Sequence, residues 1–153
     1  MIDASQQIDR NNRTVNSNEA IVSSSTWTFS AATTGAVGVH TLFTVTGNLV
    51  VSVFGHCTTD ITGSGTGAVG TANNTQAFIA TTTGTNIDAN EWWQNATPTA
   101  EVGATVSPAL PIGSSTDIIL TIGTATLTAG VVTFYCLWRP LDNLSTLTVT
   151  TPA

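Results

Sequence analysis

The stretch GVVTFYCLW, Gly130–Trp138, is the longest apolar run of the sequence. It is rich in β-branched and aromatic residues, which favour strands over helices. Because its apolar residues hardly alternate with polar ones, we expect this strand to lie in the centre of a sheet. Pro140 ends the run. The shorter run DIILTI, Asp117–Ile122, has the same character and predicts a second central strand.

Elsewhere apolar and polar residues alternate with a period of two, which is the pattern of strands with one buried face. Thr26–Ser30 shows this alternation first, and Ser145–Thr150 repeats it near the other end of the chain. Shorter strands are expected at Ala68–Ala72 and Gln76–Thr82. The Gly- and Thr-rich residues 58–67 predict a flexible connection.

Two runs in the first half of the chain are separated by only two residues. Thr41–Thr46 and Leu49–Cys57 flank Gly47-Asn48. Glycine and asparagine are the residues that tight two-residue hairpin turns favour. The sequence therefore predicts a β-hairpin at this point.

About eight or nine short strands with regular turn signals fit an all-β fold, an antiparallel β-sandwich or a jelly-roll-like module. A chain of 153 residues suits one such domain, to which we assign residues 26–153. Residues 1–25 show neither a strand period nor a helix period, so they predict an extended N-terminal arm. A disordered tail or a first edge strand is the alternative for this segment.

The surface carries unusually little charge. Charged residues make up 8% of the chain, no lysine is present, and threonine is about one residue in five. Charge normally keeps a free monomer soluble, so this composition favours a protein that is covered in an assembly. A secreted protein with a hydrated, hydroxyl-rich surface is the alternative. The net charge of −6 excludes nucleic-acid binding as the main role, because that binding depends on Lys and Arg contacts to phosphates.

The first residues of the sequence bear on the cellular compartment that we expect for the protein. No basic segment followed by an apolar run is present at the start, so we expect no signal peptide and synthesis in a cytoplasm. Thiols stay reduced there, and Cys57 and Cys136 are therefore predicted to be buried free thiols rather than a disulfide. No run of about 20 apolar residues occurs, so no membrane partner is expected.

Few residues suit catalysis or metal binding. His56 adjoins Cys57, but neighbours in a strand point to opposite faces, which argues against a nucleophile pair. The paired Cys and His spacings of zinc sites are absent. Asp88 and Glu91 offer oxygen ligands for Ca²⁺, although we favour carboxylates that cap a turn. We expect no enzyme activity, no cofactor and no bound metal.

The aromatic pair Trp92-Trp93 is the strongest candidate for an interaction site. In an extended segment one indole faces the core and the other faces solvent. Exposed aromatics form interface hot spots or stack on sugars. We place a subunit interface first, core burial second and glycan binding third. With the arm, this predicts an interface set of Ile2, Ile8, Arg10, Arg13, Ile21, Trp92 and Trp93.

The middle of the chain, from Gly38 to Glu101, carries a longer pattern. It contains GVHTLFTVTGNLVV, then GHCTTDITGSGTGAVGTANNTQAFIATTTGTNIDANEWW, and then ATPTAE. This pattern resembles a β-rich module found in structural proteins of tailed bacteriophages. In that module a strand ending in FTVTG precedes one ending near CTTD, and an A-x-I-A-x-T strand and a D-A-x-E-x-W segment follow. The resemblance covers about two fifths of the chain and includes no catalytic motif.

The resemblance implies a non-enzymatic virion protein of the capsid decoration or head-fibre type, which binds the shell and neighbouring copies. Its partners would be the major capsid protein or other virion proteins, with homo-oligomers expected, trimers favoured, and a host glycan as a further ligand. The alternatives are a tail- or neck-associated virion protein and a carbohydrate-binding β-sandwich module. A hydrolase built on Cys57 or on an acidic pair is a third hypothesis.

Overall fold

The computed structural model describes residues 6–8, 14–16, 20–100 and 109–152. These residues form twelve strands and one short 3-10 helix, and no helix among them has the length and apolarity that crossing a bilayer requires. The first strands are β1 (Gln6–Ile8), β2 (Thr14–Asn16), β3 (Ile21–Thr28), β4 (Gly38–Thr46), β5 (Leu49–Thr62), β6 (Thr66–Gly70) and β7 (Ile79–Thr83). They are followed by η1 (Gly84–Asn86), β8 (Trp92–Trp93), β9 (Leu110–Ile112), β10 (Ile118–Gly123), β11 (Ala129–Pro140) and β12 (Thr146–Val149).

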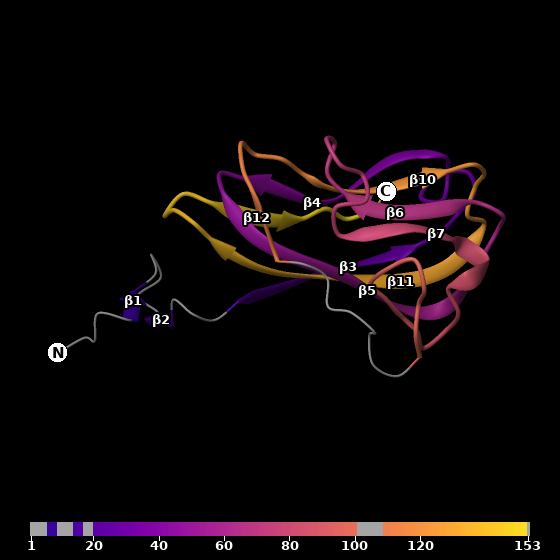
Figure 1. Ribbon diagram of the computed structural model, residues 1–153, viewed down its shortest axis with the longest axis horizontal. Helices are drawn as coiled ribbons and strands as arrows, with labels where there is room; N and C mark the ends of the chain where they lie inside the picture. The colour runs from indigo at the N-terminus through magenta and orange to yellow at the C-terminus, as the bar shows by residue number, and fades with distance from the viewer. Residues whose placement is uncertain (1–5, 9–13, 17–19, 101–108, 153) are drawn as a thin grey trace.

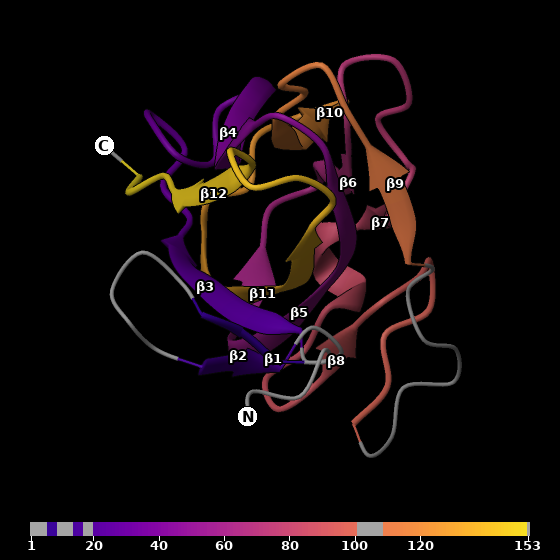
Figure 2. The same ribbon diagram turned by 90° about the vertical axis from the view of Figure 1, so that its left-hand side faces the viewer.

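Two antiparallel sheets pack face to face, so the fold is all-β and sandwich-like, as the sequence predicted (Figure 1). One sheet has the order β12-β4-β10-β6-β7. The other has the order β3-β11-β5-β8, with β9 paired to the first part of β5. The end-on view in Figure 2 shows the two layers on opposite sides of the core. β1 and β2 pair only with each other in the described part of the chain.

The two strands that the apolar runs predicted to be central are central. β10 lies between β4 and β6, and β11 lies between β3 and β5. β11 pairs with β3 from Val131 to Trp138 and with β5 along nearly its whole length. A strand with neighbours on both edges in a sandwich buries one face completely and much of the other, which explains its continuous apolar sequence.

The predicted hairpin at Gly47-Asn48 is wrong. β4 pairs with β10 and β12 in one sheet, whereas β5 pairs with β11, β8 and β9 in the other. The turn therefore carries the chain between layers, with Gly47 at a φ of 76° and the Asn48 N–H donating to Ser145 Oγ at 2.7 Å. Val45 and Leu49 are both buried on either side of the turn. Both residues can be buried whether the turn joins two strands of one sheet or carries the chain from one sheet to the other.

Two further boundaries differ from the prediction. β3 begins at Ile21, where it pairs with Trp138, so the sandwich begins about five residues before residue 26. Residues 58–67 are mostly strand, because β5 continues to Thr62 and β6 begins at Thr66. The turn between them has Gly63 at a φ of 105°, a conformation that glycine adopts without strain.

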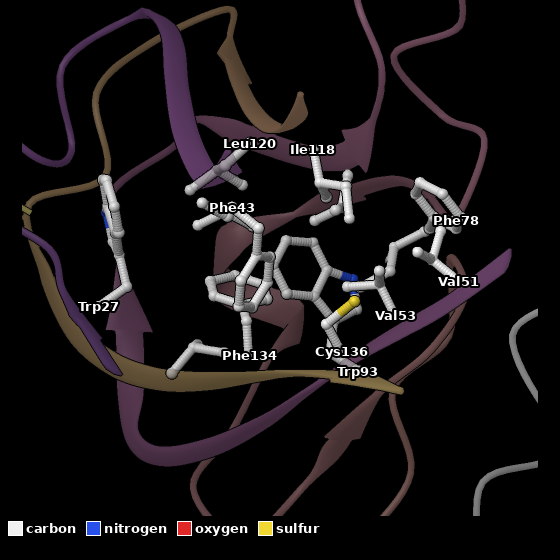
Figure 3. Packing of buried hydrophobic residues seen from close by; sticks show 14 of the residues in the cluster. Trp27, Phe43, Val51, Val53, Phe78, Trp93, Ile118, Leu120, Phe134 and Cys136 are labelled. Carbon is white, nitrogen blue, oxygen red and sulfur yellow. The ribbon is translucent and has the colours of Figure 1, made fainter. Parts of the chain in front are cut away.

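The core lies between the layers and is organised around the indole of Trp93, which is fully buried (Figure 3). Trp93 belongs to one sheet, and its Nε1 donates a 2.8 Å hydrogen bond to Oγ1 of Thr82 in the other. Its ring centroid lies 5.8 Å from that of Phe134. Gly67 lies against the same ring, because a Cβ placed there would be 2.8 Å from Trp93 Cη2. The indole therefore links the two sheets through packing and a hydrogen bond.

We expect Gly67→Ala to destabilise the fold by about 1–3 kcal/mol, because the added methyl group overpacks against an indole that cannot move aside. Urea unfolding measures the change. Gly123→Ala is the matched control, since its Cβ meets only the Thr66 hydroxyl, at 3.2 Å. Equal midpoints for the two variants would contradict the close contact with Trp93.

We expect Thr82→Val to destabilise the fold by about 1–3 kcal/mol, because it keeps the side-chain shape and leaves a buried indole N–H without an acceptor. Thr83→Val, at the next and exposed position, is the control and should change the unfolding free energy little. A shift of equal size in both variants would show that β propensity rather than the hydrogen bond is responsible.

Candidate binding face

Four aromatic side chains gather on the outward side of the β3-β11-β5-β8 sheet. Phe54 and His56 come from β5, Trp92 from β8 and Tyr135 from β11, and we call this group the aromatic face. Strand pairing sets their positions, because Tyr135 lies opposite Phe54 and Trp92 lies opposite His56. Trp93 points into the core, so its neighbour Trp92 points outward. This confirms the prediction that the two indoles face opposite sides.

The four rings contact one another in a continuous group. Phe54 and Tyr135 stack with centroids 5.5 Å apart and an angle of 24° between planes. The ring centroid of Trp92 lies 4.5 Å from that of His56, 5.8 Å from that of Phe54 and 6.4 Å from that of Tyr135. All four side chains are half-buried. Mutual packing restricts their rotamers, so the group is largely ordered before any partner binds.

The polar atoms of this face are available. Among the described residues, neither the Tyr135 hydroxyl, the Trp92 Nε1 nor the His56 ring makes a hydrogen bond. Thr26 and Thr133 contribute hydroxyl groups beside the rings, 3.1 Å from one another. The face therefore offers stacking surfaces together with hydrogen-bonding groups.

Charge is confined to the two ends of the sandwich in the described part of the chain. Asp60, Asp88 and Glu91 lie where β5 ends and the loop before β8 runs. Arg139 and Asp142 lie at the opposite end, where β11 ends, and Asp117 lies there too, with its Oδ1 accepting the Val45 N–H near the end of β4. The aromatic face between these ends is uncharged.

Two of the three carboxylates at the acidic end cap backbone amides. Asp60 Oδ1 accepts the Ala89 N–H at 2.6 Å, and Glu91 Oε2 accepts the Asp88 N–H at 2.9 Å. The Glu91 contact agrees with the turn-cap interpretation of that residue, whereas Asp88 takes part through its backbone N–H. No group of three His, Cys, Asp or Glu residues in the described ranges is arranged to hold a metal.

Both cysteines are buried and unpaired, as predicted. Cys57 points into the core and its thiol donates to the Thr59 carbonyl at 3.1 Å, while His56 points outward. Burial raises the pKa of Cys57 to about 11, with the Thr59 contact opposing the rise and the Asp60 carboxylate adding to it. Burial alone raises the pKa of Cys136 to about 12. Thiols held in this protonated state are poor nucleophiles.

The predicted interface residues fall into different places. Ile2, Arg10 and Arg13 lie outside the described residues, and Ile8 is the last residue of β1. Ile21 is exposed, at 40%. The full burial of Trp93 removes it from any surface of the folded domain, since it packs the core instead.

The sequence did not predict Phe54 and Tyr135 as members of an interaction site, and it pointed to His56 only as a catalytic candidate. In β5 and β11, half-buried aromatic residues alternate with buried residues. An aromatic residue outside a two-layer sandwich has no covering layer, which marks it as a candidate contact residue.

A second apolar feature lies at the end of the sandwich where β3 begins. Ile21 and Val22 are 40% and 61% exposed, and Leu141 and Leu144, in the turn after β11, are 59% and 69% exposed. Ile21 pairs with Trp138, three residues before Leu141, which places these side chains at one end. We call it the arm end, because residues 1–20 precede β3 there (Figure 1).

Comparison with protein-family models, with curated proteins and with solved structures found no match to this chain.

We expect the free energy of unfolding to fall as the pH rises from about 9 toward 11 and 12. Both thiols have folded-state pKa values raised above their ordinary value of 9.0, so the unfolded chain releases these protons first. Their contribution is complete below pH 9 and is lost above it. Urea titrations across this range measure the slope, which should be shallower in Cys57→Ala and in Cys136→Ala. If neither variant changes the slope, the two thiols are not the cause of the loss of stability at high pH.

Proposed function

We propose that this chain is a non-enzymatic structural protein of a tailed-bacteriophage virion, of the capsid decoration or head-fibre type. The sequence pattern from Gly38 to Glu101 supports this proposal, and the part of it that the structure describes runs from β4 to β8 and contributes strands to both sheets. The low charge of the chain is a second support, because a neutral surface suits a protein that is packed against others.

The observation that carries the proposal is the arm end. Four large apolar side chains are exposed there, beside the point where residues 1–20 join the domain. Ile21 and Val22 are neighbours in β3 and point to opposite faces of the sheet, so the apolar groups border both sides of this end. Exposed apolar groups gathered at one end of a domain mark a surface that a partner covers. A polar arm and an apolar end at the same place form an attachment surface for a shell of repeated subunits.

Many copies on one shell can be held by a surface that binds weakly in a single copy. The arm end is small, and a contact of that size is weak on its own. Copies that also contact their neighbours bind at a high effective concentration, so weak contacts add to stable occupancy. The partners in this proposal are the major capsid protein and neighbouring copies of the chain, in trimers.

We expect the double variant Leu141→Ser, Leu144→Ser to lower incorporation into virions by about tenfold or more, because it removes two exposed leucine side chains that attachment to the shell would bury. Quantitative mass spectrometry of purified virions, after complementation of a deletion phage, measures the copy number. Circular dichroism confirms that the variant is folded. High copy numbers of the wild-type chain indicate a lattice protein, and low ones a neck or tail component.

The matched control is Val37→Ser with Val39→Ser. These valines are 56% and 61% exposed, similar to the two leucines, and lie at the start of β4, away from the arm end. Incorporation of this control should equal that of the wild type. Absence of the wild-type chain from virions would overturn the proposal.

A further inference from the structure

We propose that the aromatic face binds a neutral carbohydrate, with Trp92 and Tyr135 as the stacking surfaces. The inference stands on this face alone and does not depend on attachment to a virion. The face lies on the outward side of a sheet, whereas the arm end lies at the tip of the sandwich.

The arrangement of the rings fits a sugar chain. Sugar rings present C–H groups on their flat faces, and the electron-rich faces of aromatic rings attract these groups. Trp92 lies within 6.4 Å of Tyr135 and 5.8 Å of Phe54, so the rings form one platform rather than isolated side chains. Contacts between the rings hold them in place, which reduces the ordering that binding would require.

The unpaired polar atoms supply the second part of sugar recognition. The Tyr135 hydroxyl donates and accepts, the Trp92 indole donates, and a neutral His56 ring does both at its two nitrogens. These groups border the platform and have no hydrogen-bond partner among the described residues. Carbohydrates carry hydroxyl groups around an apolar ring face, which is the complement of this arrangement.

Charge distinguishes a neutral sugar from other ligands that stack on aromatic rings. Single-stranded nucleic acids also stack on such platforms, but they require a positively charged groove along the backbone. The aromatic face has no positive side chain in the described residues, where the one arginine, Arg139, lies at the end of β11. Sulfated and sialylated glycans are disfavoured for the same reason. A neutral ligand is therefore the one whose charge matches the face.

A second copy of the chain is the competing occupant. A stable protein interface buries about 800 Å² on each partner and is closely packed and apolar at its centre. Here the rings are bordered by polar atoms that have no partner in the described part of the chain, and a packed protein interface would have to satisfy them one by one. A sugar satisfies them through its hydroxyl groups and ordered water.

The test uses the full chain and an array of neutral, sialylated and sulfated oligosaccharides. Calorimetric titration with soluble hexasaccharides of glucose, mannose, galactose and N-acetylglucosamine then gives affinities. Fluorescence provides an independent readout, because Trp27, Trp93 and Trp138 are at most 9% exposed and Trp92 is the half-buried one. Binding at the platform should shift the Trp92 emission and protect it from acrylamide.

We expect Trp92→Ala and Tyr135→Ala each to weaken binding by about tenfold or more, since each removes a stacking surface. Tyr135→Phe and Trp92→Phe keep a ring and the fold, so they should weaken binding only a few-fold. Val39→Ala is the control, because it removes exposed apolar surface outside the aromatic face, and its affinity should be unchanged.

Several outcomes would overturn the inference. These are no binding to any neutral glycan, binding to charged glycans alone, or neutral binding that Trp92→Ala leaves intact. Size-exclusion chromatography with light scattering is run on the same variants. A chain that binds no neutral glycan and whose oligomer dissociates on Trp92→Ala would assign the face to a second copy of the chain instead.

Discussion

Burial of one indole between the two sheets is the constraint on which the rest of the structure depends. Trp93 belongs to a strand of only two residues, so its position is fixed by packing rather than by a long ladder. Gly67 leaves the space that the ring occupies, and Thr82 supplies the acceptor for its N–H. The indole therefore needs a residue without a side chain in one layer and a hydroxyl group in the same layer. These requirements fix how the sheets face one another.

The aromatic face is a consequence of the same burial. Successive side chains of a strand point to opposite faces, so placing Trp93 inside places Trp92 outside. The pairing of β8 with β5 then brings Trp92 against His56, and the pairing of β5 with β11 adds Tyr135. The surface platform and the core are thus built from the same short strand. A change of register at β8 would lose both together.

The sequence predicted the parts of the fold that local patterns encode. The continuous apolar runs identified β10 and β11 as central strands, because a strand with neighbours on both edges buries one face and half-buries much of the other. The connection at Gly47-Asn48 was predicted wrongly, since a short turn between two half-buried strands has the same local pattern within a sheet and between sheets. Which layer a strand joins depends on partners distant in sequence, such as the pairing of β4 with β10.

The same distinction explains what the sequence revealed of the candidate site. Trp92 was visible because two adjacent tryptophans must diverge, whereas Phe54 and Tyr135 looked like ordinary core residues until their strands were assigned to an outer face. The aromatic face and the arm end lie at different places on the sandwich. β3, β5 and β11 run lengthwise away from the arm end (Figure 1). A domain attached at that end, as we propose, would leave the sides of both sheets open. The two proposed interactions would then use different residues.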